Sequence, residues 1–181
     1  MATQLRRKLG YVDYERIPAD GKRHEILDGE LYVTPAPSPL HQRLSKRLQR
    51  RLEDYFEARG IGEVFNAPTD LILAEHDIVQ PDLLVVGHPS HVTHRAIEGT
   101  PLLVVEVLSP STRALDRSVK MRRYADLGIL HYWVLDPDAE RIECLRLDEG
   151  TYRTVVDAAV PQTLHHPDFP ELAIDLAALW R

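Results

Sequence analysis

The sequence contains only one cysteine, Cys144, in 181 residues. A single thiol excludes an intrachain disulfide, and no nucleophile signature surrounds it, so we expect a small residue on a strand face rather than a thiol enzyme. No apolar run is long enough to span a membrane, and the charged N-terminal stretch MATQLRRKLGYVDYERIP lacks the apolar segment of a secretory signal. We therefore expect a cytoplasmic protein without a membrane partner.

A basic excess is also missing, since the formal net charge is −6. This value argues against nucleic-acid binding through bulk electrostatics. The basic residues are nevertheless unevenly distributed: HQRLSKRLQRRLEDYFEARG contains a run of them, consisting of Arg43, Lys46, Arg47, Arg50 and Arg51. A solvated helix face is the simplest interpretation of such a run, which by itself indicates no function.

Length and composition, with 44% hydrophobic and 28% charged residues, suit one globular domain over residues 1–181. There is no internal repeat, zinc finger or helix-turn-helix pattern. The first expected elements are a hairpin in HEILDGELYV that turns at Asp28-Gly29, and a helix from about Leu40 to Gly60. Strands are expected between 63 and 87, with the first pair turning at Ala67-Pro68, and a second helix from Ser109–Thr112 to Gly128. Three strands with turns at 136–138 and 148–150 follow, and FPELAIDLAALW is expected to form a short amphipathic helix. This order predicts an α/β fold with a mixed central β-sheet flanked by α-helices.

Two acids lie in otherwise apolar strand segments. Glu106 interrupts LLVVEVL, and Asp82 follows Pro81 at the start of LLVVG. A buried carboxylate requires a proton, a cation or a metal as its partner. Either acid alone would be interpreted as a strand-end cap or half of a salt bridge. If the two strands pair, however, the carboxylates converge, as a hard divalent cation such as Mg²⁺ requires of its oxygen ligands.

A lysine follows on the next predicted helix. At about 100° per residue, Lys120 shares a face with the apolar residues Tyr124 and Leu127. Its ammonium group either pairs with Asp116 one turn earlier or reaches over the strand end to the two carboxylates. The spacing leaves both alternatives open.

These motifs together form a recognisable pattern. QPDLLVV, LLVVEVLSPST, the spaced Asp116, Lys120, Tyr124 and Gly128, and YWVLDP resemble the Uma2 family of restriction-endonuclease-like proteins, a branch of the PD-(D/E)XK nuclease superfamily. The resemblance extends upstream to HEILDGELYV and His41, so it covers the chain from about position 10 to the last strands. It implies a restriction-endonuclease-like fold.

The resemblance also implies an activity, that of a phosphodiesterase dependent on Mg²⁺ or Mn²⁺, without an organic cofactor. Asp82 and Glu106 would bind the metal together with the backbone carbonyl of Val107. Lys120 would position the attacking water and offset charge on the phosphate. The superfamily usually places this lysine two residues after the acid, where this chain has Leu108; in this family it is thought to lie on the following helix.

Two further positions match the family. Glu25 and His41 could line the same cleft, although Glu25 also suits the polar face of a hairpin and His41 a helix start. Ser109 and Ser111 are interpreted as helix caps, because no Ser-His-Asp arrangement is visible. The three histidines of GHPSHVTH, which are His88, His91 and His94, are interpreted as loop residues rather than a zinc site.

The leading hypothesis is therefore a metal-dependent DNA endonuclease, expected to act as a homodimer. DNA phosphates would be contacted by the basic run, chiefly Arg43, Lys46, Arg47 and Arg50, and by Arg113, Arg117, Arg122 and Arg123. Leu108 motivates a second hypothesis, in which a nuclease fold binds DNA or a protein partner without cutting. In a third, Asp82, Glu106 and Lys120 form a buried structural ion network.

Overall fold

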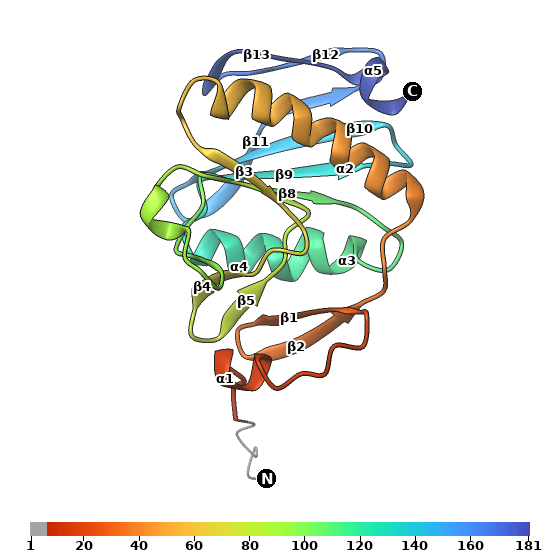
Figure 1. Cartoon of the computed structure of the whole chain (residues 1–181). Helices are drawn as coiled ribbons and strands as arrows, with labels where there is room; N and C mark the ends of the chain where they lie inside the picture. Colours follow the sequence, from red (N-terminus) through yellow and green to blue (C-terminus); the bar gives the residue numbers. More distant parts are fainter. Residues whose placement is uncertain (1–6) are drawn as a thin grey trace.

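A computed structural model describes residues 7–181; the first six residues of the N-terminal stretch lie outside it. The described chain forms a six-stranded, a five-stranded and a two-stranded sheet, together with helical segments (Figure 1). The expected α/β architecture, with a mixed central sheet flanked by helices, is present.

The six-stranded sheet has the order β11-β10-β9-β8-β6-β3. Its strands are β3 (Glu63–Asn66), β6 (Leu83–Val86), β8 (Leu103–Val107), β9 (His131–Asp136), β10 (Arg141–Asp148) and β11 (Thr151–Ala159). The five-stranded sheet, in the order β2-β1-β5-β4-β7, contains β1 (Arg23–Leu27), β2 (Glu30–Thr34), β4 (Leu71–Ala74), β5 (Asp77–Val79) and β7 (Ile97–Glu98). The small sheet pairs β12 (Thr163–His166) with β13 (Phe169–Asp175).

The helical segments are α-helices and short π-helical or 3₁₀ turns. The α-helices are α1 (Tyr11–Tyr14), α2 (Pro39–Leu52), α3 (Arg113–Leu115), α4 (Met121–Asp126) and α5 (Leu176–Trp180). The π-helical turns are η1 (Glu53–Glu57), which continues α2, and η3 (Asp116–Lys120), which joins α3 to α4, while η2 (Pro89–His91) is a 3₁₀ turn. Among the described residues, no helix is long and apolar enough to cross a membrane.

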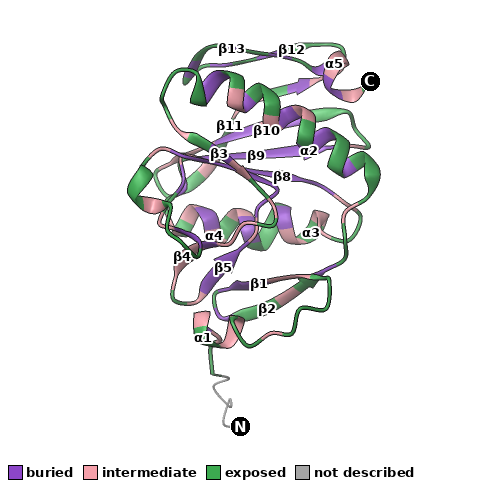
Figure 2. Ribbon diagram, viewed as in Figure 1, coloured by how far each residue is buried: buried purple, intermediate pink, exposed green. Residues whose placement is uncertain are grey.

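The six-stranded sheet carries an apolar core on each face. Side chains alternate along β8, so that Leu103 and Val105 pack with the α2 side, whereas Val104 packs with Tyr124 of α4 on the other. Figure 1 shows α2 and the α3–α4 segment on opposite sides of this sheet, and Figure 2 shows its central strands as the most buried part of the fold. By the same alternation Glu106 faces the α3–α4 side.

The parallel pair β8–β9 explains why that helical segment lies there. Parallel neighbours require a crossover connection, and α3, η3 and α4 form it across one face of the sheet. The crossover therefore carries Lys120 back over the strand that contains Glu106.

Several expected local features are confirmed. The hairpin β1–β2 turns at Asp28 and Gly29, both with positive φ. The two long helical segments end near Gly60 and Gly128, whose positive φ values suit glycine. Cys144 is buried on β10, as expected of a small strand-face residue.

Two local predictions were wrong. The strands on either side of Ala67-Pro68 do not pair with each other, because β3 pairs with β6 and β4 pairs with β5, in different sheets. The segment FPELAIDLAALW is not one helix: Phe169–Asp175 is a strand whose Leu172 and Ile174 point into the core, and only Leu176–Trp180 is helical. Pairing with β12 overrides the local amphipathic pattern.

Candidate functional site

The pairing of β6 with β8 brings two of the predicted acids together. Leu83 lies opposite Val105, so Asp82, one residue before β6, comes next to Glu106. Asp82 Oδ2 accepts a hydrogen bond from the Val107 amide at 2.8 Å. The two acids are only 4% and 2% exposed, so both carboxyl groups are largely removed from bulk water.

A cavity of about 260 Å³ lies at this end of the sheet. The five residues predicted as catalytic, metal-binding or additional site residues all line it, namely Glu25, His41, Asp82, Glu106 and Lys120. Arg23 and Asp116 line it as well, together with residues 34–38 and 108–112 from the loops beside β2 and β8. From α2, Leu40 and His41 at the start of the helix line the cavity, whereas the residues of the basic run lie outside its lining.

Lys120 is buried among carboxyl groups. Its Nζ donates to Oε1 of Glu25 and to Oε1 of Glu106, each at 3.0 Å, and lies 3.6 Å from Oδ1 of Asp116. Lys120 therefore lies close to Asp116 one turn earlier and also reaches Glu106, one of the two strand carboxylates; its third neighbour is Glu25 rather than Asp82. Its position in the π-helical turn η3 is a departure from the regular helix on which the sequence prediction was based.

Glu106 receives two donors on the same oxygen. Tyr124 Oη donates to Oε1 at 3.1 Å, alongside Lys120, whereas Oε2 makes no hydrogen bond within residues 7–181. Burial raises the pKa of Glu106 to about 8; Lys120 opposes this rise, and the neighbouring carboxylates of Asp116, Asp82 and Glu25 reinforce it. Without a further cation, the carboxyl group is therefore mostly protonated at neutral pH.

Asp82 lies in a different electrostatic environment. Burial would raise its pKa, but the hydrogen bond from His41 and the charge of Arg23, with the Val107 amide, hold the pKa below its ordinary value. Arg23 Nη1 lies 2.9 Å from Oδ1, and His41 Nε2 lies 3.0 Å from Oδ2. Two neighbouring acids thus have pKa values that are shifted in opposite directions.

Sequence reasoning did not identify Arg23 as a site residue, and it treated Asp116 only as a partner of Lys120. The signal for Arg23 was its spacing of two from Glu25, which places both side chains on one face of β1. Asp116 is 2% exposed, and burial raises its pKa. With Asp116 included, the described residues that line the cavity supply four buried carboxyl groups, those of Glu25, Asp82, Glu106 and Asp116, and the exposed Asp138, against two permanent cations, Arg23 and Lys120.

The basic residues named in the sequence divide into two groups. Arg43, Lys46 and Arg50 are exposed on α2, whereas Arg47 is half-buried and donates to the backbone carbonyls of Leu179 and Arg181. On the crossover, three arginines are held in ion pairs: Arg113 with Asp136, Arg117 with Glu143 and Arg123 with Asp77.

The structure also places the serines after β8 and the three loop histidines. Ser109 Oγ accepts from the Thr112 amide, and Thr112 Oγ1 accepts from the Ser109 amide, so these side chains close their own turn instead of capping α3. Among the described residues, His88, His91 and His94 belong to no group of His, Cys, Asp or Glu side chains close enough to hold a metal ion.

Comparisons with known proteins agree with this architecture. A crystal structure described as that of "a putative nuclease belonging to DUF820" from Anabaena variabilis superposes with a TM-score of 0.76, at 17% identity, over 95% of this chain and 97% of the other. An uncharacterized protein of Synechocystis, slr1290, is 33% identical over 115 residues, which is 63% of this chain and 60% of the relative.

A family model gives the assignment. The model named Uma2, described as "Putative restriction endonuclease", matches residues 11–177, nearly the whole described chain. The resemblance found in the motifs is therefore confirmed by an independent match, and the structural neighbour supports the nuclease-like fold. The chain belongs to the Uma2 family.

Proposed function

We propose that the protein is a divalent-metal-dependent endonuclease that hydrolyses DNA phosphodiester bonds at the cavity lined by Asp82 and Glu106. The observation that carries this proposal is the convergence of two buried strand carboxylates in a cavity whose lining has more acids than permanent cations. The description of the Uma2 family and the nuclease-like structural neighbour support the same reaction class.

The residues present fit a hard cation. Lys120 and Tyr124 both donate to Oε1 of Glu106, which leaves Oε2 free of hydrogen bonds within the described chain. In an extended strand the N–H and C=O of one residue point to the same edge, so the Val107 carbonyl shares the edge at which its amide meets Asp82. Asp82, Glu106 and this carbonyl would supply the oxygen ligands that Mg²⁺ or Mn²⁺ prefers.

Each part of the site then has a defined role. A bound Mg²⁺ ion would supply Lewis-acid polarisation of the phosphate and a lower pKa for a coordinated water. Lys120, kept protonated by its carboxylate neighbours, offsets negative charge on the phosphate and orients the water. Arg23 lines the same cavity and presents a planar group suited to a phosphate. Glu25 holds Lys120 in place, and His41 holds Asp82.

The test is cleavage of supercoiled plasmid and single-stranded DNA in Mg²⁺, Mn²⁺ or EDTA. Asp82→Asn should lower the rate of metal-dependent cleavage by roughly a hundredfold or more, because it removes a charged ligand. Asp54→Asn, which changes an exposed acid on η1, is the matched control and should cleave normally. Folding of both variants is checked by circular dichroism. Binding of DNA without cleavage by the wild type would contradict the proposal and favour a non-cutting module.

The non-cutting alternative was motivated by Leu108, which occupies the usual position of the superfamily lysine. The Lys120 ammonium group, which comes from the crossover rather than from β8, lies 3.0 Å from Glu106 and supplies a cation beside this acid. The reason for preferring the non-cutting alternative is therefore weaker. We further propose that the exposed face of α2 formed by Arg43, Lys46 and Arg50 contacts DNA phosphates. Homodimerisation, implied by the superfamily resemblance, is a separate proposal that sedimentation analysis would test.

A further inference from the structure

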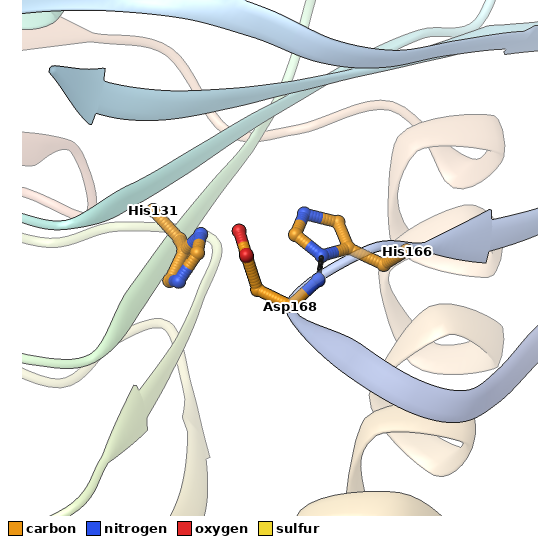
Figure 3. Close-up of side chains that lie close together, drawn as sticks. All are labelled: His131, His166 and Asp168. Atoms are coloured by element: carbon orange, nitrogen blue, oxygen red, sulfur yellow. Dashed lines mark hydrogen bonds between the residues drawn. The ribbon is translucent and has the colours of Figure 1, made fainter.

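A second group of potential ligands lies away from the cavity. His131 is the first residue of β9, His166 is the last residue of β12, and Asp168 lies in the turn between β12 and β13. One ligand atom from each residue lies within 4.8 Å of the other two, and Figure 3 shows the three side chains facing one another.

This cluster is separate from the proposed nuclease site. Along the parallel pair β8–β9, His131 lies opposite Leu103, whereas Glu106 lies three residues further along β8. His131 also contacts Phe169 in the core on the α2 side of the sheet, opposite the face to which Glu106 belongs. None of the three cluster residues lines the cavity of Asp82 and Glu106.

Two imidazole nitrogens in the cluster lack partners. Nδ1 of His131 and Nε2 of His166 are buried and make no hydrogen bond within residues 7–181. The residues are 2% and 4% exposed, and buried polar atoms of this kind ordinarily have a partner.

We propose that His131, His166 and Asp168 form a structural site for a first-row transition metal, with Zn²⁺ as the favoured ion. Two imidazole nitrogens and one carboxylate are a common donor set for Zn²⁺, whereas Mg²⁺ and Ca²⁺ prefer oxygen ligands alone. A neighbouring surface cavity, lined by His131, Asp168 and Arg146, gives water access to complete the coordination.

Metal binding requires two local adjustments. Ligand atoms around a tetrahedral Zn²⁺ lie about 3.3–3.5 Å apart, so the cluster must contract. Asp168 can move, because it lies in an exposed turn and, within residues 7–181, its carboxylate is held by Arg146 alone, at 2.9 Å. The Asp168 amide also donates to Nδ1 of His166 at 3.1 Å, and ligation through Nε2 places the ring proton on Nδ1. This hydrogen bond must therefore be released towards solvent at the turn.

The consequence would be a crosslink between separate parts of the fold. β12 and β13 form their own two-stranded sheet, and the metal would connect their turn to the beginning of the central strand β9. The ion would thus stabilise the docking of the C-terminal hairpin rather than take part in phosphodiester cleavage.

The test uses the full chain after removal of metals, titrated with Zn²⁺ by calorimetry and with Co²⁺ by visible absorption, in excess Mg²⁺. We expect one equivalent to bind, with a four-coordinate cobalt spectrum. The Tm should rise by roughly 5–10 °C when Zn²⁺ is about a hundredfold above its Kd. Asp168→Ala and His166→Gln should each weaken binding by at least about tenfold.

Two controls make the result decisive. His165→Gln changes the exposed neighbour on β12 and should bind like the wild type, as should Asp82→Asn, which alters the other site. If His166→Gln fails to fold, the Asp168→Ala variant, which changes an exposed residue, still tests whether this cluster binds the metal. Absence of Zn²⁺ and Co²⁺ binding, binding unchanged by Asp168→Ala, or binding lost in either control would overturn the proposal.

Discussion

Glu106 and Asp82 show how two adjacent acids acquire different chemistry from their surroundings. Glu106 has its pKa raised to about 8 by burial and by nearby carboxylates, despite Lys120. Asp82 is equally buried, but hydrogen bonds and the charge of Arg23 keep its pKa low. Neighbouring titratable groups with pKa values shifted apart are typical of functional sites.

The raised pKa of Glu106 predicts a pH-dependent stability in the absence of metal. Its folded-state pKa of about 8 exceeds the ordinary 4.5, so the folded protein binds the extra proton between these values. This contribution is complete below pH 4.5 and is lost as the pH rises to 8. Glu106→Gln, which cannot ionise, should therefore gain stability over the wild type across this range, by about 1.4 kcal/mol per pH unit at most.

Urea unfolding of both proteins in EDTA at pH 5, 6.5 and 8 measures this difference. A difference in the free energy of unfolding that does not change with pH would mean that Glu106 is ionised throughout. The same experiment bears on the structural ion-network hypothesis, in which an ionised Glu106 stabilises the fold. Asp82→Ala is less informative, because it leaves Arg23 and the Val107 amide without their partner under every hypothesis.

Tyr124 is predicted to position Glu106 for metal binding. Tyr124→Phe removes the donor to Oε1 but retains the buried ring, so the free oxygen is less firmly oriented. The affinity for Mn²⁺, measured by calorimetry, should fall by roughly 10- to 100-fold. Tyr152→Phe is a matched control, because it removes a hydroxyl that donates to the Ile129 carbonyl outside the cavity. Equal affinities in the two variants would contradict this role.

The crossover between β8 and β9 is the element on which the site depends. Its middle is the π-helical turn η3, which contains both Asp116 and Lys120. Such turns are uncommon and often occur at functional sites. Because the crossover must return over the parallel pair, it brings Lys120 against the face on which Glu106 lies.

Replacement of Lys120 should destabilise the protein strongly. Lys120→Met leaves the carboxyl groups of Glu25, Glu106 and Asp116 without their shared cation, and breaking a buried ion cluster costs roughly 3–5 kcal/mol. The loss should be smaller at pH 5 than at pH 8, because the raised pKa of Glu106 lets that carboxyl group bind a proton at the lower pH. Lys46→Met, an exposed change on α2, should alter stability by less than about 0.5 kcal/mol. A pH-independent loss for Lys120→Met would argue against a shared charge.

Across the protein surface, the acidic net charge coexists with a local basic face on α2. Arg43, Lys46 and Arg50 are exposed there, whereas Arg47 is bound to the backbone near Leu179. Local charge of this kind can direct DNA to one side of an acidic protein.

The salt dependence of DNA binding tests this face. In an Asp82→Asn background, replacing Arg43, Lys46 and Arg50 together by Gln should reduce the slope of log K against log salt by roughly 0.9 for each lost contact with duplex DNA. Fluorescence anisotropy at several salt concentrations measures the slope. Arg153→Gln, on the exposed strand β11, serves as control. An unchanged slope in the triple variant would place the DNA on another face.

Much of the local structure was predictable because it depends on neighbouring residues. The Asp28-Gly29 hairpin, the ends of both long helical segments and the buried position of Cys144 follow from turn chemistry and periodicity. The motif order was sufficient to recognise the family that the comparison confirmed. The adjacency of Asp82 and Glu106 was also expected, although only on the condition that their strands pair.

Tertiary structure decided the remaining features, because strand pairing and crossover geometry depend on contacts between residues distant in sequence. Local patterns could not show that β3 and β4 enter different sheets or that Phe169–Asp175 forms a strand. Nor could they bring Arg23 to Asp82, 59 positions away, or His131 to His166. The sequence thus supplied the chemical groups and the local turns, whereas long-range packing determined which buried charges and unpartnered nitrogens share a site.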